Sequence, residues 1–181
     1  MWLMAYPFGL KMGMSISEIA GLCEEEPTFI EDDIYYITPL KSHPLFAYYA
    51  AYVHPENGLY KIRAISYQIK SNKYGQEIKE TFNSIKDKIQ LSYGKARLID
   101  ECKKTTDNYH LKEEYWFYLL QNGSRKLQAV WNKKNGLEKD LVLITLDASV
   151  TQGVYEGTTQ LILHYHFKNS YEVEAIENSV F

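Results

Sequence analysis

The sequence predicts an α+β fold in which two helix-β-β-β halves form antiparallel sheets packed against amphipathic helices. Three observations lead to this prediction: a helix with a clear apolar stripe, short segments rich in tyrosine and β-branched residues, and Asn-Gly turns between some of those segments. The chain has 181 residues with ordinary apolar and charged fractions, which suits one compact domain over residues 1–181.

Two helices are predicted from their end signals and periodicity. The longer one carries a single apolar stripe over three turns, formed by Ile78, Phe82, Ile85 and Ile89. Gly94 is placed to end it, since glycine readily adopts the conformation that follows a helix. A shorter helix is predicted after Ser15, because Ser15 and Glu18 have the spacing of a capping box.

Six segments are predicted as strands: residues 33–38, 46–54, 59–69, 126–132, 141–149 and 158–167. Within the third of these, Lys61 and Arg63 face away from the apolar side. Residues 100–112 are polar and are predicted as a loop, whereas residues 115–120 form an apolar run too short to assign. The tail after Asn169 lacks periodicity and is predicted to be loose.

An internal match suggests duplication. Residues 51–61 overlay residues 129–139 without a gap and are identical at five of eleven positions. Duplication would give two structural repeats, about residues 8–70 and 71–168. The alternative is a chance match, because Asn-Gly is a common hairpin turn.

A family resemblance rests on the residues at the start of the shorter predicted helix. Gly13-Met14-Ser15, followed by Glu18-Ile19 and then an antiparallel sheet, resembles the start of outer-membrane assembly lipoproteins of the BamE/SmpA type. Two tandem copies of a helical element plus a sheet are similar to the β-lactamase inhibitor protein fold. The resemblance implies a protein that binds other proteins without catalysis, and it assigns no functional residue.

Charge and tyrosine content indicate the class of function. Residues 1–60 carry two basic against eight acidic side chains, and six of the acids lie within ten residues: Glu24, Glu25, Glu26, Glu31, Asp32 and Asp33. Such a patch can steer a basic protein partner, or it can be a solvated edge. Sixteen tyrosines suit either a sheet surface or a binding face. The leading hypothesis is a non-enzymatic protein-binding module, specifically an inhibitor or immunity protein.

Few residues offer chemistry. His164 and His166 share one strand face and are a weak metal candidate, predicted to be solvent-exposed, with no third ligand at a fixed spacing. Cys23 and Cys102 form no disulfide framework, and neither lies in a nucleophile motif. No phosphate-binding loop occurs, and the basic stretch over residues 61–104 is interpreted as a solvated helix face. We therefore predict neither a cofactor nor a nucleic-acid partner.

The predicted location is the cytoplasm. Residues 1–14 carry a single base and no cleavage-site pattern, so they make a poor signal peptide, and no apolar run is long enough for a membrane span. A periplasmic location applies if a signal once preceded Met1. Two alternatives remain: a scaffold or assembly factor of an envelope complex, and a small-molecule-binding protein or enzyme with an unrecognised pocket.

Overall fold

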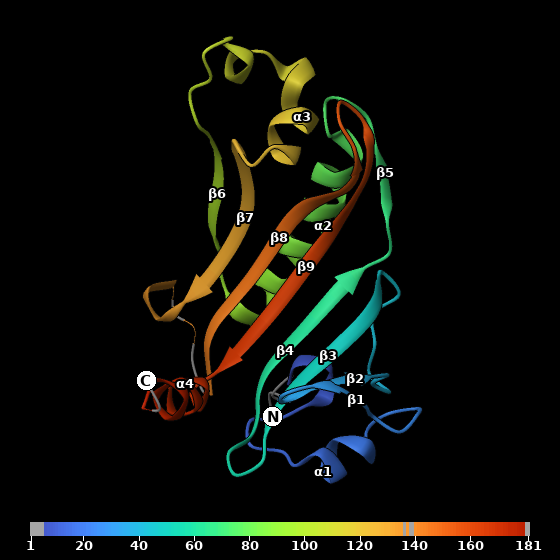
Figure 1. Ribbon diagram of the computed structural model, residues 1–181, viewed down its shortest axis with the longest axis vertical. Helices are drawn as coiled ribbons and strands as arrows, with labels where there is room; N and C mark the ends of the chain where they lie inside the picture. Colours follow the sequence, from blue (N-terminus) through green and yellow to red (C-terminus); the bar gives the residue numbers. More distant parts are fainter. Residues whose placement is uncertain (1–5, 136, 138–139, 180–181) are drawn as a thin grey trace.

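One antiparallel sheet of nine strands organises the chain in the computed structural model, which describes residues 6–135, 137 and 140–179 (Figure 1). The strands are β1 (Thr28–Glu31), β2 (Ile34–Ile37), β3 (Phe46–His54), β4 (Gly58–Ser66), β5 (Ile69–Ser71), β6 (Arg97–Cys102), β7 (Arg125–Asn132), β8 (Leu141–Gly153) and β9 (Gly157–Phe167). The α-helices are α1 (Ile16–Ala20), α2 (Gln76–Tyr93), α3 (Trp116–Gln121) and α4 (Ser170–Asn178), and η1 (Pro7–Gly9) is one of four short 3₁₀ helices. The α+β class with an antiparallel sheet is confirmed.

The two halves of the chain join at the centre of the sheet. The strand order is β1-β2-β3-β4-β9-β8-β7-β6, with β5 paired to one end of β9. Each half supplies one more strand to this row than the sequence indicated, namely β1 and β6. Counted outward from the β4–β9 pair, β3 is equivalent to β8, whereas the sequence match aligns the β3–β4 turn with the β7–β8 turn. The matched segments therefore occupy non-equivalent places in the sheet. Positions 136, 138 and 139 of the match lie outside the described residues. Duplication stays a prediction.

The core lies between one sheet face and α2. All four stripe residues of α2 are buried against the sheet, as its periodicity predicts. Gly94 follows the helix with φ +85°, and its carbonyl accepts a hydrogen bond from the indole N–H of Trp131 at 2.8 Å. The end of α2 is thereby fixed to β7.

The N-terminal helix is tied to the β3–β4 hairpin. Ser15 and Glu18 form the predicted capping box, with bonds of 3.2 and 2.8 Å. Gly58, at φ +69°, lies so close to Gly13 that an added Cβ would sit 2.2 Å from the Gly13 carbonyl oxygen. Only glycine fits this turn without displacing the segment that leads into α1.

Two sequence predictions are corrected, and the apolar run left unassigned is now identified. Residues 97–102 form the edge strand β6, so the predicted loop over 100–112 begins later than expected. Residues 116–121 form α3. The tail predicted to be loose instead contains α4, and Val173 of this helix is 1% exposed. The start of α4 is attached to the β3–β4 hairpin, because the Asn169 side-chain amide donates to the carbonyls of Asn57 and Leu59.

Membrane-spanning helices are not found in the described part of the chain, where no helix has the required combination of length and apolar character.

Candidate binding face

Among the described residues, no helix covers the centre of one face of the sheet. In Figure 1, α2 lies behind β8 and β9, while the viewer looks onto the opposite side of β3, β4, β9 and β8, with α4 at the lower end. We call this side the open face. Its central side chains come from five strands and are mostly half-buried by one another: Tyr36, Tyr48, Tyr52, Lys61, Arg63, Thr145, Asp147, His164 and His166.

Four nitrogen-bearing side chains meet where the two halves join. The β4–β9 register places Lys61 opposite His166 and Arg63 opposite His164. Residues two apart on a strand share a face, so the four side chains form one two-by-two group. We call Lys61, Arg63, His164 and His166 the basic block.

Aromatic and hydroxyl groups from the neighbouring strands surround the basic block. The Lys61 ammonium lies 4.7 Å from the centre of the Tyr52 ring, and the Arg63 guanidinium lies 5.9 Å from it. On the other side, the Thr145 hydroxyl lies 3.5 Å from Nδ1 of His164. The cations are held by ring faces and packing, which leaves part of their hydrogen-bonding capacity open.

The electrostatics of the block favour an anion. Burial, together with Lys61, lowers the pKa of His164 and of His166 to about 4, so both imidazoles are neutral at neutral pH. Burial and neighbouring Arg63 also lower the pKa of Lys61, an effect that Glu174 of α4 opposes. Within the described residues, neither Lys61 nor Arg63 has a carboxylate oxygen within 4.0 Å. Half-buried cations without an ion pair are costly, and an incoming anion would relieve that cost.

The histidine prediction is partly corrected. His164 and His166 share one face, with ring centres 6.0 Å apart, as their spacing requires. They are half-buried rather than exposed, because the side chains of β4 and β8 pack on both sides of them. Across the described residues, no three His, Cys, Asp or Glu side chains are grouped to hold a metal ion.

The acidic residues lie at the edge of the sheet. Glu24, Glu25 and Glu26 follow α1, Glu31 ends β1, and Asp32 lies in the turn to β2; these five are exposed. Phe29 and Ile30 on β1 are also exposed, at 58% and 53%. Strand β1 was not predicted from the sequence. The structure thus combines the acidic segment with an apolar, unpaired strand edge.

Asp33 is separated from this exposed group. Its carboxylate accepts a hydrogen bond from the Tyr60 hydroxyl and is half-buried near His54 and Glu177 of α4. Burial raises the pKa of Asp33, and the negative charges of Glu177 and Asp32 act in the same direction. Asp33 is therefore linked to β4 through Tyr60 and lies within electrostatic range of Glu177 on α4.

The two cysteines are free thiols at different sites. Cys23 packs against the core beside α1, and its backbone forms an isolated β-bridge with Pro39. Cys102 is the last residue of β6, at the other edge of the sheet. Burial raises the pKa of the Cys23 thiol, which is the opposite of what a nucleophile needs.

Comparison of the chain with family models, with curated proteins and with solved structures finds no match.

Proposed function

We propose that the protein is a non-enzymatic protein-binding module that docks an acidic segment of its partner on the open face. The observation that carries this proposal is the pair of half-buried cations, Lys61 and Arg63, which lack an ion pair among the described residues. A carboxylate from a partner supplies the missing charge and forms charge-assisted hydrogen bonds.

The surroundings of the block favour a protein over a nucleic acid. Tyr36 and Tyr48 lie beside it with ring centres 6.5 Å apart, and Tyr48 is 59% exposed. Tyrosine and arginine are the residue types enriched where interfaces gain most of their energy. A nucleic-acid groove would need many phosphate contacts, whereas this face offers two central cations and also carries Asp147, and the chain has a net charge of −3.

The test is a pull-down of partners at low and high salt with two matched variants. Lys61→Gln/Arg63→Gln removes the two charges while keeping long polar side chains. Lys95→Gln/Lys104→Gln removes the same charge at two exposed positions outside the block. We expect a stoichiometric partner to be kept by the control and lost by the block variant, with the wild-type complex weakening as salt rises. Equal capture by both variants would overturn the proposal.

A second docking surface is favoured by a separate observation, the exposed acids beside the exposed strand β1. In that arrangement the protein acts as an inhibitor or immunity protein, and a basic partner adds to the sheet edge through Phe29 and Ile30. Charge reversal at Glu24, Glu25 and Glu26 should then slow association and flatten its salt dependence. Unchanged association rates would exclude this edge as the docking surface.

The partner's nature also distinguishes the scaffold alternative. An envelope complex of several subunits, retained at high salt, would favour a scaffold or assembly factor. A single cytoplasmic protein, released by salt, would favour the inhibitor hypothesis and a cytoplasmic location.

A further inference from the structure

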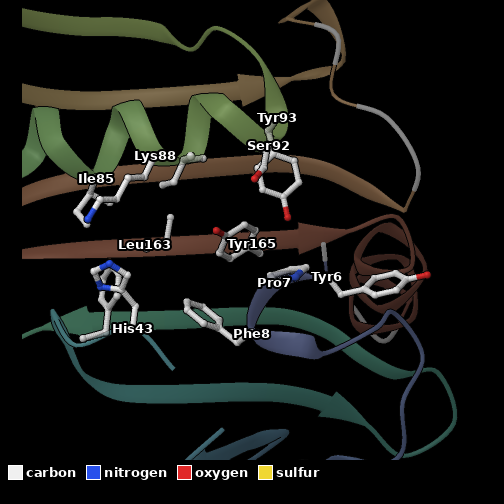
Figure 2. Close-up of a pocket in the computed structure, with 12 residues that line it drawn as sticks. Tyr6, Pro7, Phe8, His43, Ile85, Lys88, Ser92, Tyr93, Leu163 and Tyr165 are labelled. Carbon is white, nitrogen blue, oxygen red and sulfur yellow. The ribbon is translucent and has the colours of Figure 1, made fainter. Parts of the chain in front are cut away.

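A cavity lies on the opposite side of the sheet from the basic block. It has a volume of about 210 Å³ and lies between α2, the N-terminal segment and the loop before β3 (Figure 2). Its floor is formed by Leu163 and Tyr165 of β9, which alternate with the histidines of the block. The cavity and the block are therefore separate sites, and a ligand in the cavity is independent of the proposed function.

Most of the cavity wall is apolar. Phe8 enters it from η1 with φ +53°, a conformation that residues other than glycine rarely adopt. Its ring lies edge-on to Tyr165 at 5.9 Å and to Phe46 at 6.3 Å. Ile85 and Ile89 of α2 form the facing wall. A planar apolar group would lie between these rings and branched side chains.

One end of the cavity carries two nitrogen donors. In Figure 2, Lys88 on α2 reaches toward His43 on the opposite wall. The Leu45 amide donates to Nδ1 of His43 at 3.1 Å, so the proton of the neutral ring is on Nε2. Burial and the charge of Lys88 lower the pKa of His43, which favours the neutral ring.

The position of His43 is fixed by its neighbours. Its backbone amide donates to the Tyr49 hydroxyl at 2.9 Å, and that hydroxyl donates back to the His43 carbonyl at 3.2 Å. No acidic residue is among the described residues that line the cavity. An apolar space with a cation and an N–H donor at one end, and no carboxylate in its described lining, is complementary to a small apolar anion.

We propose that this cavity binds a monocyclic aromatic carboxylate, with its ring between Phe8 and Ile85 and its carboxylate at Lys88 and His43. The size is suitable, since an apolar cavity of about 150 Å³ already accommodates benzene. The carboxylate accepts one hydrogen bond from the Lys88 ammonium and one from Nε2 of His43.

Benzoate and the uncharged benzamide are the probes, titrated into the full chain and followed by calorimetry and by protein NMR. We expect benzoate to bind with a dissociation constant of ~1 mM or tighter, and benzamide about tenfold more weakly, because it lacks the charge that Lys88 pairs. Signals of Ile85 and Leu163 should move on binding.

Two matched variants complete the test. Lys88→Gln should weaken benzoate about tenfold, to the level of benzamide. Lys86→Gln should leave benzoate binding unchanged, because Lys86 pairs with Asp87 at 3.5 Å and does not line the cavity. Equal affinities for the two probes, an unaffected Lys88→Gln variant, NMR shifts confined to other regions, or no binding by either probe would each overturn the proposal.

Discussion

Replacing His164 and His166 by glutamine should remove a pH-dependent loss of stability that the open face imposes on the protein. The pKa of each imidazole is lowered from 6.5 to about 4 in the folded chain. As the pH falls through 6.5, these two imidazoles become protonated in the unfolded chain, whereas in the folded chain they stay neutral until about pH 4. The free energy of unfolding therefore decreases across this window and is unaffected by these groups above it.

The magnitude follows from the size of the lowering. A change from 6.5 to about 4 corresponds to ~3.4 kcal/mol for each ring if nothing screens the charge. Because both rings are only half-buried, solvent screening reduces this to about 1.5 kcal/mol per ring, or about 3 kcal/mol for the pair. Lys61 and Arg63 face the rings from β4. On β8 the Thr145 hydroxyl faces His164, and Leu143 lies opposite His166.

Urea denaturation followed by tryptophan fluorescence measures the effect. Between pH 7 and pH 4.5 we expect the wild type to lose about 2–3 kcal/mol more than the His164→Gln/His166→Gln variant. Other groups with altered pKa values, such as Asp147, are common to both proteins and cancel in the difference. Parallel losses in the two proteins would refute the reasoning, and so would NMR titration of either imidazole near pH 6.5.

Two further predictions concern packing. Gly75→Ala should lower the free energy of unfolding in urea by about 3 kcal/mol, because φ is +65° and the new methyl group would lie 2.0 Å from the Trp116 ring. Gly123→Ala, at φ +78° with open space around it, should lower it by about 1 kcal/mol. Equal losses would show that the Trp116 ring moves aside freely. Asn169→Ala should lower the free energy of unfolding by about 2–3 kcal/mol and make α4 sensitive to proteolysis, because two hydrogen bonds of 2.9 and 3.0 Å to backbone carbonyls are lost. An unchanged cleavage rate would show that α4 is held by its apolar contacts alone.

Elements with a strong local signal were predicted from the sequence. The stripe of α2 and the capping box at Ser15 are set by residues within a few positions of one another. The turn at Gly58 is local too, because a positive φ at that position is what the glycine supplies. The final strand, predicted as 158–167, is β9 to within one residue.

Elements at the sheet edges were missed because their sequences lack that signal. All four residues of β1 are exposed, and β6 has only two half-buried positions, so neither strand shows an apolar alternation. Helix α4 buries one apolar residue, Val173, and its place is set by Asn169 bonding to a distant hairpin. These elements form through tertiary contacts.

The sequence predicts the faces on which the residues of the basic block lie, but not that they meet. The alternation in residues 59–69 places Lys61 and Arg63 on the polar side, and the spacing of the two histidines places them on one face. Their meeting depends on the pairing of β4 with β9, about 100 residues later, and on its register. A shift of one residue would bring Leu163 and Tyr165 to the open face, which the apolar alternation disfavours. A shift of two residues would keep each side chain on its face but change the pairs, and no local pattern fixes that choice.

The most direct test of docking on the basic block is an NMR titration of the His164 and His166 imidazole signals with the captured partner. If an acidic segment docks there, both signals should move, and their pKa values should rise from about 4 because an anion stabilises the protonated ring. Unchanged imidazole signals, with shifts confined to β1 and the β1–β2 turn, would contradict docking on the open face and place the interface at the acidic edge.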